Sequence, residues 1–195
     1  MNAADQAYES ALTELVALGR LRSVSYFRKQ RSDLLRRLGQ RDQAREQLDL
    51  SIQAAEAGGY IDFVHFAHVS DARLHLADGD ARSLLPQLER ADAYADMMDM
   101  PRLKGEVLRT RAEILLLQNE TTLAADLVSW ALRIANLNGL VLRRIAYSEL
   151  LSKIYRKQGN VIAADRLLQW TSRSARDIGY ALSLHRLEGN RDLVR

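Results

Sequence analysis

The chain has 195 residues, no cysteine and a formal net charge of +3. This length suits one ordinary domain with a sizeable core, and 47% apolar residues exclude a disordered chain. The lack of cysteine excludes disulfides, thiolate metal sites and cysteine nucleophiles. No apolar run reaches the roughly 18 residues that a membrane span needs, and the N-terminal segment lacks the residue order of a signal peptide. We therefore expect a soluble, cytoplasmic protein.

Residues of matched chemistry recur every 40 positions along the chain. Small and apolar residues form several such columns, among them Ala55, Ala95, Ala135 and Ala175, and Leu48, Leu88, Val128 and Leu168. Glycine marks two further columns: Gly19, Gly59, Gly139 and Gly179 with Asp99 in the remaining slot, and Gly39, Gly79 and Gly159 with Asn119 in the remaining slot. A fixed period of this length indicates an array of structural repeats.

The apolar residues of each period fall on helical spacings, so each repeat predicts two helices. Ala, Leu, Arg, Gln and Glu dominate the composition, which favours helix over strand. Glycine after a predicted helix is typical of a left-handed C-cap, and Pro101 suits a first helical turn. In chain order the predicted helices are 3–18, 22–38, 42–57, 61–77, 82–98, 101–117, 121–137, 141–157 and 161–177.

We predict a single repeat domain over residues 1–195. It consists of a half repeat (3–19), four full repeats (20–59, 60–99, 100–139 and 140–179) and a partial helix (180–195) that brings the number of helices to about ten. The half repeats either cap the array or belong to a longer array. The last segment carries the apolar stripe Leu182, Leu184 and Leu187, which predicts self-association through terminal half repeats.

A small residue recurs at a matched position of each first helix, and alanine or leucine at a matched position of each second helix. The first helix carries Ser32, Ala72, Ala112 or Ser152, and the second carries Ala44, Leu84, Ala124 or Ala164. This pattern resembles the tetratricopeptide repeat, although the period is 40 rather than about 34 residues and the family's tryptophan slot holds Arg28, His68, Leu108 and Ser148. The resemblance implies an all-α, right-handed α-α superhelix of antiparallel helices, with first helices lining its concave face.

The same resemblance implies that first-helix side chains bind a protein or peptide segment in the concave groove. The predicted partner-binding residues are Tyr26, Lys29, Arg36, Phe66, Val69, Arg73, Leu76, Arg109, Glu113, Leu116, Leu117, Lys153, Arg156 and Lys157. The family's carboxylate clamp is missing, because Asp33 follows Lys29 where an asparagine is needed. We expect a groove that is apolar in its middle and basic at its flanks, which suits an amphipathic helix or an extended peptide with acidic ends.

Residues for catalysis or metal binding form no recognisable motif. The sequence has no nucleophile elbow, zinc-protease motif, phosphate-binding loop or dinucleotide glycine motif. His68, Asp71 and His75 share one face of a predicted helix, but two turns, about 10 Å, separate the two histidines, so one ion would not easily reach both. We therefore predict a non-catalytic protein without a cofactor or a metal.

Two alternative functions stay open. Lengthened repeats of this kind resemble those of large bacterial transcription regulators, so the chain could be a ligand- or protein-sensing region of such a regulator. Basic clusters such as Arg143–Arg144 could instead contact nucleic acid. The i,i+4 pair of Arg109 with Glu113 favours solvated helix faces, which makes nucleic acid the less favoured partner. Trp130 and Trp170 share one column and are interpreted as packing between repeats.

Overall fold

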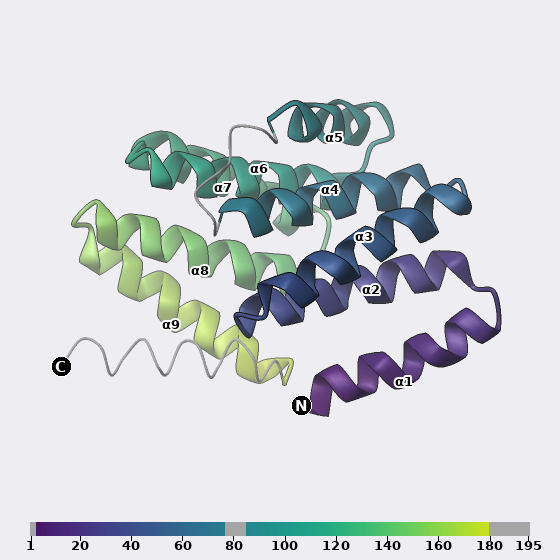
Figure 1. Ribbon diagram of the computed structural model, residues 1–195. Helices are drawn as coiled ribbons and strands as arrows, with labels where there is room; N and C mark the ends of the chain where they lie inside the picture. The colour runs from purple at the N-terminus through teal and green to yellow at the C-terminus, as the bar shows by residue number, and fades with distance from the viewer. Residues whose placement is uncertain (1–2, 77–84, 180–195) are drawn as a thin grey trace. The chain divides into compact units, whose positions relative to one another are not determined.

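The computed structural model describes residues 3–76 and 85–179, which form α-helices joined by short turns (Figure 1). The chain divides into two compact units, Met1–Met97 and Met98–Arg195. Unit 1 contains α1 (Ala3–Ala17), α2 (Leu21–Arg37), α3 (Arg41–Ala57), α4 (Ile61–Leu76) and α5 (Leu85–Met97), and unit 2 contains α6 (Pro101–Leu117), α7 (Thr121–Leu137), α8 (Val141–Lys157) and α9 (Val161–Asp177). The predicted all-α class is confirmed, with nine helices and no strand in the described ranges.

The observed helices keep the 40-residue period of the sequence. The first helices α2, α4, α6 and α8 begin at Leu21, Ile61, Pro101 and Val141. The predicted boundaries agree with the observed ones to within one residue at every helix end that does not adjoin residues 77–84. The partial helix predicted for 180–195, with its apolar stripe, lies outside the described residues. None of the helices in the described ranges is long and apolar enough to cross a membrane.

A left-handed residue follows nearly every helix. Gly39 has a φ of 77°, its N–H donates to the Arg36 carbonyl (3.2 Å), and the Gln40 N–H donates to the Leu35 carbonyl (2.9 Å). These are the two hydrogen bonds of a Schellman motif. Asn119 (φ 64°) and Asp99 (φ 47°) occupy the slots without glycine, and their short polar side chains tolerate this conformation better than most. The glycine columns of the sequence therefore mark the helix ends, as predicted.

Small side chains lie where the helices approach one another closely. The alanine column Ala55, Ala95, Ala135 and Ala175 is buried at every position, and so is the column of Ser32, Ala72, Ala112 and Ser152. A close approach also explains the glycine inside α6, because a Cβ at Gly105 would lie 2.7 Å from the Tyr147 hydroxyl oxygen. These columns therefore form the packing interfaces, as the repeat pattern predicts.

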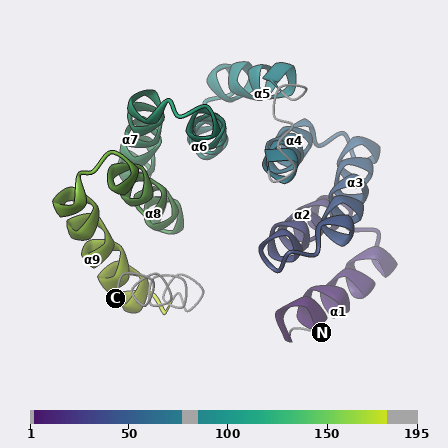
Figure 2. The ribbon, with the colours of Figure 1, turned by 60° about the vertical axis from the view of Figure 1, so that its left-hand side comes forward.

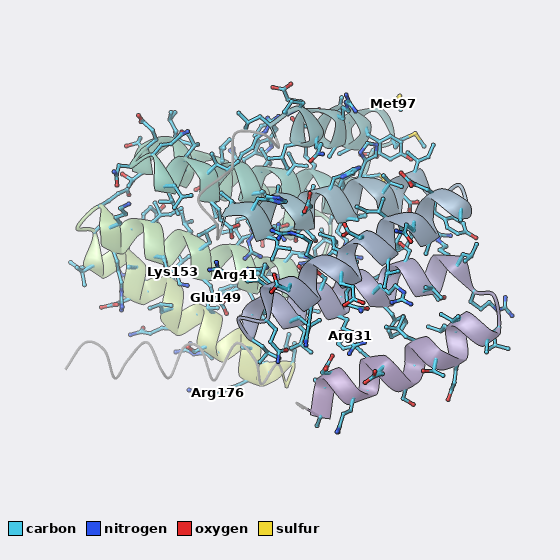
Figure 3. All side chains as sticks on the ribbon, in the orientation of Figure 1. Arg31, Arg41, Met97, Glu149, Lys153 and Arg176 are labelled. Atoms are coloured by element: carbon cyan, nitrogen blue, oxygen red, sulfur yellow. The ribbon has the colours of Figure 1, made fainter. Side chains whose placement is uncertain are left out.

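Each unit has apolar clusters of its own. In unit 2, Leu108, Val128 and Ile154 belong to one continuous apolar cluster, and Figure 2 shows α6 and α8 on one side of this unit and α7 and α9 on the other. The clusters of unit 1 include one around Leu12 and another around Leu35. Polar contacts supplement them. In particular, the Arg31 Nε lies 2.6 Å from the Asp5 Oδ1 and ties α2 to α1 (Figure 3).

The burial of the alanine column leads to a stability prediction. Ala135 is 0% exposed on α7, so a phenylalanine there must overpack the interface. We expect Ala135→Phe to lower the free energy of unfolding by roughly 1–3 kcal/mol, measured by urea unfolding followed by circular dichroism. Ala93→Phe, at an exposed position of α5, is the matched control and should change it by less than about 0.5 kcal/mol. Equal effects of the two substitutions would show that the alanine column is not part of the core.

Candidate functional site

The predicted binding positions of unit 1 lie on α2 and α4, and they differ in accessibility. Tyr26, Arg36, Phe66 and Leu76 are half-buried, and the Tyr26 hydroxyl accepts a hydrogen bond from the Gln30 amide (2.9 Å). Three others are almost fully buried, namely Lys29, Val69 and Arg73. The exposed charge of the first-helix positions in this unit is therefore carried by Arg36 together with its exposed neighbour Arg37.

Lys29 and Arg73 belong to a buried charge cluster around Asp33. The Lys29 Nζ donates to the Asp33 Oδ2 at 2.6 Å, with both side chains largely covered. Burial by itself would raise the pKa of the Asp33 carboxyl, but the positive charges of Lys29, Arg73 and Arg36 and the Lys29 hydrogen bond outweigh it and lower this pKa to about 2. Three cations thus act together on one buried carboxylate and keep it ionised.

In unit 2 the predicted positions lie on α6 and α8 and are mostly paired within the unit. Arg109 contacts Glu113 through its Nε at 3.1 Å, which confirms the i,i+4 pair predicted from the sequence. Arg156 reaches α9, where its Nη2 lies 2.7 Å from the Asp165 Oδ1. The Lys157 ammonium donates to the Leu116 carbonyl (3.1 Å) and to the Asn119 side-chain oxygen (2.9 Å), so it joins the end of α8 to the end of α6.

The remaining positions of unit 2 differ in exposure. Lys153 is exposed on α8 (Figure 3), and Leu117 is 59% exposed. Leu116, in contrast, is partly buried and packs against the apolar cluster of unit 2. Leu116 therefore has a structural role, and Lys153 and Leu117 are the more accessible candidates for contact with a partner.

Sequence reasoning missed a buried polar group at the centre of unit 2. Glu106 of α6 is 3% exposed, and its Oε1 accepts hydrogen bonds from Tyr147 (3.2 Å) and lies 2.8 Å from the Arg143 guanidinium of α8. The two partners are some 40 residues away from Glu106, close to one repeat period. That spacing is the one signal that could have revealed the contact, because equivalent positions on successive first helices become neighbours.

The histidines of α4 do not come together as a metal site. The His75 Nδ1 lies 3.2 Å from the Asp71 Oδ1, and the His65 ring lies against the Tyr94 ring of α5 with centroids 4.5 Å apart. Burial lowers the pKa of both His65 and His68. In residues 3–76 and 85–179, no group of three or more metal-ligating side chains is close enough to hold an ion.

The two tryptophans lie at the surface of unit 2 rather than fully inside a packing interface. Trp130 is 44% exposed and Trp170 is 38% exposed. A cation from the preceding helix covers each ring, with the Lys104 Nζ 5.4 Å from the Trp130 centroid and the Arg144 guanidinium 5.1 Å from the Trp170 centroid. The shared column thus produces the same contact in both repeats.

Comparison with known proteins does not extend these observations. No protein-family model matches the sequence, and none of the curated proteins matches it.

The buried carboxylate of Asp33 leads to a prediction about acid stability. Because its pKa is depressed in the folded state, Asp33 stabilises the fold above about pH 4, and this stabilisation is lost as the pH falls toward 2. We expect Asp33→Asn to cost about 2 kcal/mol at pH 7 and progressively less below pH 4, measured by urea unfolding across this range. Asp165→Asn removes a more exposed ion pair and should cost less than about 1 kcal/mol. If Asp33→Asn lowered the free energy of unfolding equally at all pH values, the charge cluster would not be what lowers the pKa of Asp33.

His65 leads to a second pH prediction. Here burial is the main cause of the lowered pKa, whereas at Asp33 neighbouring charges are. Burial lowers its pKa in the folded state, so the unfolded chain binds more protons and stability falls as the pH drops below about 6.5. His65→Phe keeps an aromatic contact with Tyr94 and removes this titration. We expect this variant to lose less stability than the wild type between about pH 7 and pH 5. Thermal unfolding at several pH values measures the difference. Tyr94→Phe is the control and should keep the wild-type slope.

Proposed function

We propose that the chain is a non-catalytic helical-repeat scaffold, similar to tetratricopeptide-repeat proteins, that binds a protein or peptide segment through its first helices. The proposal includes a right-handed superhelical stacking of the repeats. Its support is the 40-residue period, which governs the sequence and the helix boundaries alike. In arrays of this kind each repeat contacts its neighbours, so equivalent side chains form continuous rows that an elongated ligand can follow.

The observation that carries the proposal is that each unit exposes a positive side chain on a first helix, Arg37 on α2 and Lys153 on α8. In unit 1, Arg37 is exposed beside half-buried Arg36 at the end of α2. In unit 2, Lys153, Arg156 and Lys157 lie within one and a half turns at the end of α8. Cations stabilise the last turn of a helix, which accounts for Arg156 and Lys157. It does not account for Lys153, which lies one turn earlier and is exposed.

Positive side chains that are accessible on first helices favour an acidic partner. Half-buried Tyr26 and Phe66 and exposed Leu117, which also lie on first helices, supply apolar contact area. An amphipathic helical peptide with acidic side chains on its polar face combines both requirements. We therefore propose a protein segment of this chemistry as the partner.

Binding of a designed peptide pair tests this function. We expect a fluorescein-labelled amphipathic peptide with glutamates on its polar face to bind the intact chain, and the same peptide with lysines to bind at least tenfold more weakly. Arg37→Glu and Lys153→Glu, both at exposed positions, should each weaken the acidic peptide by roughly threefold to tenfold. The readout is fluorescence anisotropy, with circular dichroism to show that the variants fold.

Arg173→Glu provides the matched control, since Arg173 is an exposed arginine of a second helix, α9. It should leave peptide affinity within about twofold of the wild type. Equal binding of the acidic and basic peptides would contradict the proposal. Preferential binding of a single-stranded oligonucleotide, with affinity that falls steeply as salt increases, would favour the nucleic-acid alternative instead.

A further inference from the structure

Helix α7 exposes three of its large apolar side chains, whereas its buried face is made up mostly of alanines. The buried face consists of Ala124, Ala125, Val128, Ala131 and Ala135. On the adjacent face, Leu123 is 53% exposed, Trp130 is 44% exposed and Leu137 is 87% exposed. Close packing within the unit accounts for the buried alanines, but it does not require large apolar side chains on the exposed face. Packing within the unit therefore does not explain the exposed apolar face of α7.

The spacing of these residues is that of a coiled-coil seam. Leu123, Leu127, Trp130, Ile134 and Leu137 follow one another at alternating steps of four and three residues along α7. Leu127 and Ile134 are partly buried at the edge of the unit's core, and the other three are the exposed residues. We call these five residues the α7 seam. It runs for about 21 Å, the length of a short helix–helix contact.

The 40-residue repeat does not require this seam. The positions that correspond to Leu123, Trp130 and Leu137 hold Gln43, Leu50 and Ala57 in α3, and Ala163, Trp170 and Asp177 in α9. Neither of these helices has a large apolar residue at all three positions, although both fold to the same length as α7. Exposed apolar stripes that the fold itself does not need mark interaction surfaces.

The charges beside the seam indicate what covers it. Asp126 and Arg133 are exposed on the same edge of α7 and lie seven residues apart. In heptad terms both occupy g positions. The opposite edge carries Ala124 and Ala131, which are buried against the unit's own core. When two such helices pack in antiparallel orientation, g positions face g positions. Asp126 of one helix then lies opposite Arg133 of an identical helix, and the reverse pair forms as well.

We propose that the α7 seam is a self-association surface, on which a second copy of this chain docks its own α7 in antiparallel orientation. In the register that pairs Asp126 with Arg133, Leu127 of one copy packs against Trp130 of the other, and Leu123 packs against Ile134. The contact is isologous, because each residue pair occurs twice about a two-fold axis. A parallel arrangement would instead bring Asp126 opposite a buried alanine and would leave both charges unmatched.

Sedimentation velocity of the intact chain over a wide concentration range tests the surface. We expect a reversible monomer–dimer equilibrium. Leu123→Glu places a carboxylate opposite Ile134 of the other copy and should abolish the dimer at concentrations where the wild type is half associated. Ile162→Glu on α9 is the matched control, since Ile162 is 70% exposed and lies outside the seam, and it should leave the equilibrium unchanged. Circular dichroism checks that both variants keep their helix content.

A charge swap tests the antiparallel register separately from the apolar seam. Arg133→Asp places Asp126 of each copy opposite an aspartate of the other copy. These two repulsive pairs should weaken the dimer by about tenfold or more. Combining it with Asp126→Arg restores both attractive pairs and should return the affinity to near the wild-type value. Arg173→Asp, the corresponding exposed arginine of α9, should have no effect.

Three results would overturn the proposal. A wild-type chain that stays monomeric at all concentrations would show that the seam does not bind a second copy. A dimer that persists in Leu123→Glu would place self-association on another surface. A dimer that is weakened by Arg133→Asp but not restored by the double charge swap would exclude the antiparallel register.

Discussion

Within residues 3–76 and 85–179, the constraint on which the structure depends is a left-handed residue that lies two positions after the end of a helix. Its conformation closes the two Schellman hydrogen bonds that end the helix, and it leaves seventeen residues for each full helix. Because all full helices have the same length and the same turn, equivalent residues return to equivalent places. Asn119 and Asp99 show that the requirement is a positive φ rather than glycine itself.

Equal helices can pack regularly only if their contact positions stay small. The buried alanine column lets second helices approach their neighbours, and Gly105 gives Tyr147 room to cross from α8 to α6. That crossing brings the tyrosine hydroxyl to Glu106, which also receives Arg143. A buried carboxylate is costly unless its oxygens are paired, so the glycine, the tyrosine and the arginine form one packing unit. Each residue of this group depends on the others.

The two proposals use different helices of a repeat. First helices carry the cations on which the proposed acidic partner depends, whereas α7, a second helix, carries the apolar seam. The two proposals therefore concern different faces, and a variant in one should leave the other unaffected. Trp130 and Trp170 each pack against a neighbouring cation on one side of the ring. Much of each ring nevertheless stays exposed.

The sequence by itself determined the helical class, the period, the helix ends and most of the small-residue core. It could do so because glycine, alanine and apolar spacing act locally, within one helix and its turn. Only the tertiary structure decided which side chains of the predicted groove are accessible. Arg73 has the same place in its repeat as exposed Lys153, yet it is 6% exposed. Lys29 and Val69 are likewise almost fully buried where their equivalent Arg109 is only half-buried. The pairing of Glu106 with Tyr147 likewise required the fold, since a contact across 41 residues depends on how successive first helices lie side by side.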